Sequence, residues 1–85
     1  MAEKTTDEVA AIFSAAGDSV TVINGDKVTG QTDADWKNEL QRNVDHLETI
    51  KAYKKEDGTT SIWGSENFTA IDAAVTSGKS KIAAL

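Results

Sequence analysis

A regularly spaced row of large apolar side chains between residues 33 and 54 constrains the fold of this chain more than any other feature. The row predicts one long amphipathic helix, because its members all fall on one side of a helix with 3.6 residues per turn. Acidic residues precede the row and lysines close it, which is the order that the helix dipole favours. We therefore expect a helix over residues 33–55 whose apolar side is buried; the row consists of Trp36, Leu40, Val44, Leu47 and Ile50.

A first helix is expected near the N-terminus. Thr5 and Glu8 have the spacing of a capping box, in which each residue satisfies a backbone N–H group of the other. Apolar residues then recur at helical spacing as far as Ala16. Because Gly17 tolerates left-handed backbone, it is the expected end of this helix, which covers residues 6–16.

A third helix is expected over residues 67–84. Gly78 lies on its apolar side, although glycine in a helix interior costs roughly 1 kcal/mol relative to alanine. Either another backbone approaches closely at Gly78, or the helix breaks there into two pieces. The unbroken apolar spacing beyond the glycine favours the close approach; that spacing is set by Ile71, Ala74, Val75, Gly78, Ile82 and Leu85.

The segment between the first two helices has the composition of a β-hairpin. Residues 19–23 (SVTVI) are rich in β-branched side chains, which favour strands. The dipeptide Asn24-Gly25 follows, and Asn-Gly favours a tight turn with positive φ. We expect a hairpin over residues 19–29, joined by a short third strand at residues 60–63. The predicted fold class is α+β, with this small sheet packed on the helices.

Length and composition point to a single domain spanning residues 1–85. The chain contains no cysteine, so neither a disulfide nor a thiolate metal site is available. Ten acidic and four basic residues fall in residues 1–50, and the net charge of the chain is −5. Nucleic-acid binding normally requires a clustered basic face, so no nucleic-acid partner is expected. No signal peptide and no membrane span is expected either.

One segment imitates a nucleotide-binding motif. Residues 73–80 (AAVTSGKS) match a loose phosphate-loop pattern, in which Lys79 would contact the γ-phosphate and Ser80 a magnesium ion. A phosphate loop follows a strand and opens a helix, whereas the residues before this segment have helical spacing. We therefore expect no nucleotide and no other cofactor, and no metal-ligand or catalytic constellation is recognisable.

Four residues are candidates for an interaction site. Asn43 interrupts the apolar row, and it either binds a loop backbone or fixes the orientation of a subunit contact. His46 and Tyr53 lie on the flank of that row, where a packed or hydrogen-bonded role for the histidine is favoured over a catalytic one. Trp36 is expected to be a core residue, because it belongs to the apolar row. Trp63 precedes the last helix and is the better candidate for a partner-facing anchor.

Several segments resemble a group of small uncharacterised proteins that are encoded by tailed bacteriophages, particularly marine ones. The resemblance covers residues 36–82 and is carried by residues 42–48 (RNVDHLE), 62–66 (IWGSE) and 70–74 (AIDAA), with Gly78 and Lys79. Residues 54–60 form a longer insertion than the pattern of that group. The resemblance implies no activity and transfers no catalytic residue. It implies that the protein is encoded by a phage.

These observations favour a non-enzymatic structural or interaction protein. With the resemblance, the expected role is that of a small capsid-associated (cement) or neck-region subunit of a virion. An intracellular adaptor or regulator that binds a host protein is the alternative. The expected partner is a capsid or other virion protein, or a second copy of the chain. The expected location is the virion or the host cytoplasm.

Overall fold

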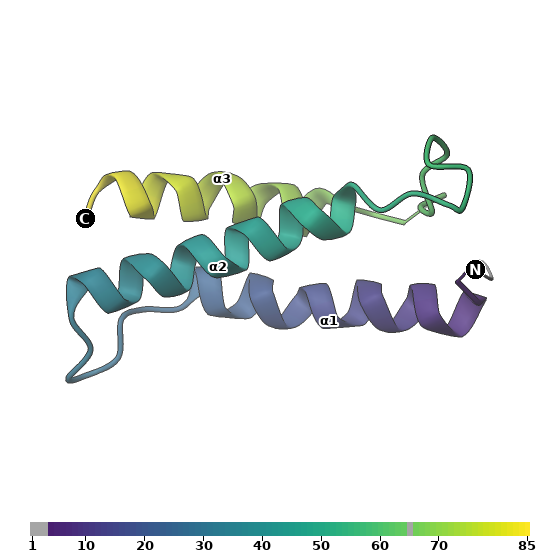
Figure 1. Ribbon diagram of the computed structural model, residues 1–85. Helices are drawn as coiled ribbons and strands as arrows, with labels where there is room; N and C mark the ends of the chain where they lie inside the picture. Colours follow the sequence, from purple (N-terminus) through teal and green to yellow (C-terminus); the bar gives the residue numbers. More distant parts are fainter. Residues whose placement is uncertain (1–3, 65) are drawn as a thin grey trace.

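The protein is built from three helices that lie side by side. The computed structural model describes residues 4–64 and 66–85, which form α1 (Thr6–Asn24), α2 (Asp33–Lys51) and α3 (Thr69–Ala83). Figure 1 shows α1 and α3 running in the same direction and α2 running against both. Each helix packs on the other two, in an elongated shape of 44 × 24 × 20 Å. The described residues contain no strand, so the α+β prediction is wrong and the fold is all-helical.

The hairpin predicted for residues 19–29 is replaced by the second half of α1, which passes through Gly17 and ends at Asn24. Ser19 and Ile23 extend the apolar side of this helix, and their exposed fractions are only 4% and 0%. Burying these positions against the other helices outweighs the strand preference of the β-branched residues beside them. Residues 19–23 are therefore helical because of tertiary packing.

The N-terminal end of α1 follows the sequence prediction. The Thr5 side chain accepts a hydrogen bond from the Glu8 backbone, and the Glu8 carboxylate accepts one from the Thr5 backbone, so the capping box is confirmed. The hydrogen bond from the Thr5 backbone lowers the pKa of Glu8. This reciprocal pair satisfies two amide groups that a helix start otherwise leaves unpaired.

The C-terminal end of α1 is held by a residue from α3. Asn24-Gly25 ends the helix instead of turning a hairpin, and Gly25 donates a backbone hydrogen bond to Val22. The Lys81 ammonium donates to the carbonyl oxygens of Ile23 (2.6 Å) and Gly25 (2.9 Å). The last turn of α1 contains no basic residue of its own. Lys81 therefore supplies the positive charge that stabilises a helix C-terminus.

The strand predicted at residues 60–63 is also absent. Instead, Lys54 and Ser61 form one isolated antiparallel bridge within the connection between α2 and α3. The long central helix stops at Lys51 rather than at residue 55, because the chain turns there into this connection. Lys51 is paired with Asp72 of α3, so its side chain ties the end of α2 to the start of the next helix.

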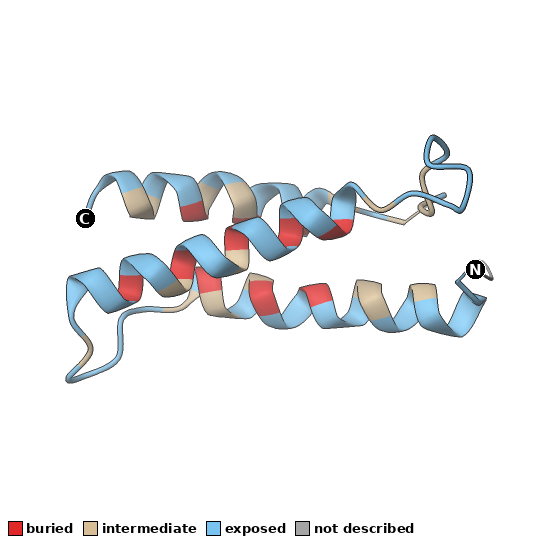
Figure 2. Ribbon diagram, in the orientation of Figure 1, coloured by how far each residue is buried: buried red, intermediate tan, exposed pale blue. Residues whose placement is uncertain are grey.

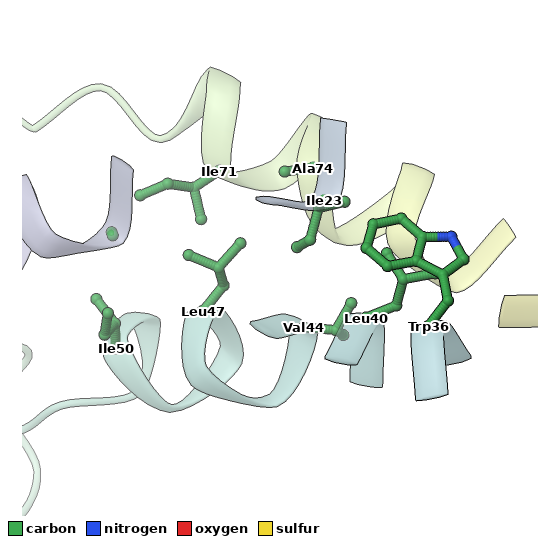
Figure 3. Packing of buried hydrophobic residues seen from close by; sticks show 9 residues of the cluster. Ile23, Trp36, Leu40, Val44, Leu47, Ile50, Ile71 and Ala74 are labelled. Atoms are coloured by element: carbon green, nitrogen blue, oxygen red, sulfur yellow. The ribbon is translucent and has the colours of Figure 1, made fainter. Parts of the chain in front are cut away.

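The hydrophobic core lies between the three helices. All five members of the apolar row of α2 are buried, as their spacing predicts. Figure 2 shows the buried positions on the sides of the helices that face one another. Figure 3 shows Leu47 and Ile50 of α2 beside Ile71 of α3, and Ile23 of α1 near Val44. The buried core consists of Ala16, Ile23, Trp36, Leu40, Val44, Leu47, Ile50, Ile71 and Ala74.

Gly78 lies where α3 packs tightly against side chains of α1 and α2. The third helix runs unbroken through this residue, so the alternative of a break at Gly78 is wrong. The neighbours are side chains and not a backbone: a Cβ atom at Gly78 would lie 2.5 Å from Val44 Cγ2 and 3.3 Å from Ile23 Cγ2. Glycine is therefore required here by packing, and its helix-propensity cost is offset by a close fit.

Candidate functional site

Three aromatic rings gather at the end of the bundle that contains the start of α1 and the connection from α2 to α3. The ring centroids of Phe13, Trp63 and Phe68 lie 5.5 to 5.9 Å apart, and each pair meets edge to face. This geometry is the one that aromatic pairs favour. Tyr53 belongs to the same end, and the Lys4 ammonium lies 5.2 Å from the centroid of its ring. We call Phe13, Tyr53, Trp63 and Phe68 the aromatic end; all four are half-buried against the core.

Trp63 is fixed in position by its polar atom. The indole Nε1–H donates a hydrogen bond of 2.7 Å to the carbonyl oxygen of Ile50, in the last turn of α2. The backbone beside Trp63 is also held, because the Ile62 N–H donates a hydrogen bond to the carbonyl oxygen of Tyr53. Trp63 therefore anchors the connection to the core and is only partly buried; its role as a partner-facing anchor stays a prediction.

We expect Trp63→Phe to lower the free energy of unfolding by about 1 kcal/mol, because phenylalanine keeps an aromatic ring but has no N–H group to donate to Ile50. Urea unfolding measures this loss. A different substitution, Phe68→Leu, removes an aromatic ring whose side chain makes no hydrogen bond and serves as the comparison. Equal stability of Trp63→Phe and wild type would contradict an anchoring role for the indole nitrogen.

The outer tip of the same connection is a tight polar turn around Asp57. Its carboxylate accepts hydrogen bonds from the backbone N–H groups of Thr59 and Thr60, both at 2.8 Å, and from the Thr60 hydroxyl. Gly58 adopts a positive φ of 75°, which the turn requires. These hydrogen bonds favour the charged form, the side-chain bond from Thr60 most of all, and lower the pKa of Asp57 to about 2.

The order of this turn is expected to depend on pH only in strong acid. Because the pKa of Asp57 falls from its ordinary 3.8 to about 2 in the folded protein, the carboxylate stabilises the turn above the ordinary value. That contribution is lost as the pH falls from 3.8 through about 2. The amide NMR signals of Thr59 and Thr60 should titrate with this low midpoint, and Asp57→Asn should abolish the titration. A midpoint at the ordinary carboxylate value would contradict the hydrogen bonding.

The Asn43 side chain forms a hydrogen bond within its own helix. Its side-chain Nδ2 donates a 2.8 Å hydrogen bond to the carbonyl oxygen of Glu39, one turn earlier in α2. The interpretation that Asn43 binds a loop backbone is therefore wrong. Its amide is satisfied at a half-buried position without a second element.

His46 forms a contact between helices. Its Nδ1 atom lies 2.9 Å from the hydroxyl oxygen of Ser19 in α1, at hydrogen-bonding distance. Ser19 is the one buried polar residue among those described, with an exposed fraction of 4%. The pair therefore places an exposed histidine over a buried serine and links α1 to α2.

The structure brings together only two of the four residues singled out in the sequence. Tyr53 and Trp63 share the aromatic end, whereas Asn43 and His46 lie farther back along α2. The sequence interpretation missed Ser19 as a partner of His46, because residues 19–23 were assigned to a strand. It also missed the contribution of Phe13 and Phe68, since their distance in sequence hides their contact.

The segment that imitates a phosphate loop is part of α3. Residues 73–80 are helical, so their backbone amides take part in the helix. Lys79 lies 3.5 Å from the carboxylate of Glu48 on α2. Across the described residues, no group of three or more His, Cys, Asp or Glu side chains is placed to hold a metal ion. None of the helices in the same residues has the length and apolar character needed to cross a membrane.

Comparison with known proteins gives no relative for this chain: no family model matches it, and no curated protein or solved structure is significantly similar to it.

Proposed function

We propose that this protein is a non-enzymatic interaction protein that docks onto another protein through its aromatic end. Following the resemblance of residues 36–82, we propose the setting of a tailed phage, with the chain as a small capsid-associated (cement) or neck-region subunit. The docking partner is then another protein of the virion.

The observation that carries this proposal is the gathering of four partly buried aromatic residues at one end of the bundle. Phe13, Trp63 and Phe68 pack against the core and are only partly buried, as are several aliphatic residues along the helices. Tryptophan and tyrosine are enriched among the residues that dominate protein interfaces. Val28 and Leu85 are also exposed, but single aliphatic residues at a surface need no partner to explain them.

The connection that carries Trp63 adds support. Residues 52–64 and 66–68, the described part of this connection, contain no helix and no strand beyond one bridge. Connections longer than about 12–15 residues without regular structure are mostly functional in compact domains. Here the chain is held by the Asp57 turn at its tip and by the indole hydrogen bond at its base. A connection fixed in this way presents its side chains with little ordering cost on binding.

The residues that carry the phage resemblance include both buried and exposed positions of α2 and α3. Val44 packs against Gly78, and Leu47, Ile71 and Ala74 are buried. Ser65, within the segment of residues 62–66, lies outside the described residues. The resemblance therefore includes part of the contact between α2 and α3, and Trp63 is its member at the aromatic end.

Mass spectrometry of purified phage particles tests the setting. We expect the chain in the particles at a fixed ratio to the major capsid protein, after removal of soluble protein by density-gradient centrifugation. Absence from the particles, with the chain present in infected cells, would overturn the virion role and leave the adaptor that binds a host protein.

A matched pair of exposed alanines on α3 tests the docking surface. Ala70 lies two residues after Phe68, and Ala83 is the last residue of the same helix. Ala70→Glu places a charge beside the aromatic end and should reduce incorporation into particles by roughly tenfold or more. Ala83→Glu should be incorporated like wild type. Equal incorporation of both variants would place the docking surface elsewhere.

A further inference from the structure

We propose that Asn24-Gly25 is a site of spontaneous deamidation that the folded structure protects, and that Lys81 provides this protection by clamping the last turn of α1. The modification needs no enzyme and no cofactor. It would convert the side-chain amide of Asn24 into a carboxylate whenever this turn opens.

The two residues have the chemistry that the reaction requires. Asn24 is exposed, and the following residue has no side chain to hinder approach of its backbone nitrogen to the Asn24 amide. The other three asparagines of the chain are followed by glutamate, valine and phenylalanine, whose side chains crowd that approach; they are Asn38, Asn43 and Asn67. Asn24 is therefore the most reactive asparagine by its local sequence.

The reaction proceeds in two balanced steps. The Gly25 backbone nitrogen loses its proton to solvent base and attacks Cγ of Asn24; an N–C bond forms, the bond from Cγ to the side-chain nitrogen breaks, and ammonia leaves. Water then opens the five-membered imide at either carbonyl. The products are aspartate, or isoaspartate in which the main chain runs through Cγ. The sum is one water consumed and one ammonia released.

In the folded structure the attacking group is held in a hydrogen bond. Asn24 is the last helical residue of α1, and the Gly25 N–H is occupied by a 3.1 Å hydrogen bond to the carbonyl oxygen of Val22. Attack on Asn24 therefore requires this turn to open. Helix ends open more readily than helix centres, so the opening is a local event that need not unfold the domain.

Lys81 opposes that opening. Its ammonium group binds the carbonyl oxygens on both sides of Asn24, those of Ile23 and Gly25. The turn cannot open with both bonds intact, and a hydrogen bond from a charged donor is among the stronger ones in proteins. The clamp comes from α3, so protection of Asn24 depends on the docking of the last helix.

Modification would prevent the turn from closing as before. A carboxylate at Asn24 stands beside the carbonyl oxygens of the helix C-terminus, where negative charge is disfavoured. Isoaspartate also lengthens the main chain between Ile23 and Gly25, the two residues that Lys81 bridges. The presence of aspartate or isoaspartate in place of Asn24 would therefore show that the Lys81 hydrogen bonds had been broken.

Incubation of the intact protein in mildly alkaline buffer tests this proposal, with the site located by peptide mapping and mass spectrometry. We expect Lys81→Ala to deamidate at Asn24 roughly tenfold faster than wild type, because the rate follows the population of the open turn. Gly25→Ala should suppress the reaction while keeping the fold, since its Cβ would meet Thr21 and Val22 carbonyl oxygens at an ordinary 3.5 Å.

A second variant separates local opening from general loss of stability. Thr5→Ala removes the cap at the opposite end of the same helix, so it should lower the stability of the protein but leave the rate at Asn24 within about twofold of wild type. An equal acceleration by Thr5→Ala would overturn the role of Lys81. In urea, Asn24 should react faster than Asn38, and a failure to do so would overturn the site itself.

Discussion

Leu47→Asp is expected to unfold the protein. Leu47 is fully buried, with an exposed fraction of 0%, at the centre of the row that α2 turns toward the other helices. Deleting a buried leucine side chain alone costs roughly 2–5 kcal/mol, and an unpaired carboxylate in the same place adds a desolvation cost of several kcal/mol. The total stability of a small domain is about 5–15 kcal/mol, so little or no folded protein should remain.

Far-UV circular dichroism and gel filtration measure this outcome, as a loss of helical signal together with an increase in hydrodynamic size. Thr49→Asp is the matched control, because Thr49 is exposed on the same helix two residues further along. The control should keep the wild-type signal. A helical signal for Leu47→Asp equal to that of the control would show that α2 does not depend on burial of its apolar row.

The same substitution, glycine to alanine, should have opposite effects at two helical positions. At Gly78 the new Cβ would lie 2.5 Å from Val44 Cγ2, so packing must shift and we expect a loss of about 1–3 kcal/mol. At Gly17, in the middle of α1, no atom lies within 4 Å of the new Cβ. We expect Gly17→Ala to stabilise the protein by roughly 0.5–1 kcal/mol, the helix-propensity difference between the two residues.

Thermal and urea unfolding measure whether each variant is more or less stable than wild type. A double-mutant cycle identifies the cause at Gly78, because Val44→Ala removes the methyl group that the new Cβ would strike. Gly78→Ala should cost less in the Val44→Ala background than in wild type. Additive costs would mean that some contact other than Val44 requires the glycine.

The helices that could be predicted are those in which local and tertiary preferences agree. For α2, the apolar row, the acidic start and the lysine at the end all favour the same helix, and its start at Asp33 was predicted. The second half of α1 shows the opposite case. Residues 19–23 favour a strand by composition, although Ser19 and Ile23 continue the helical spacing that leads to Ala16. Composition and spacing disagree at these residues, and because burial follows the spacing, the hairpin prediction is wrong.

The candidate site was predictable only in part, because its members come from distant places in the sequence. Trp63 could be singled out as a large aromatic residue outside the expected helices. Its contacts with Phe13 and Phe68 could not, since nothing local indicates which end of α1 lies beside the connection from α2 to α3. The His46 contact was likewise hidden, because its partner Ser19 becomes a neighbour only when α1 is a long helix.

The clamp at the end of α1 also affects when this protein can fold during synthesis. Ile23 and Gly25 leave the ribosome long before Lys81, the residue that binds their carbonyl oxygens. Until then the end of α1 lacks its cap, and Ile23 lacks the surface of α3 around Gly78 that covers it. Domains generally fold as units on the growing chain. Here, the hydrogen bonds that hold the end of α1 can form only after α3 has been synthesised, so the native core is completed only when α3 docks.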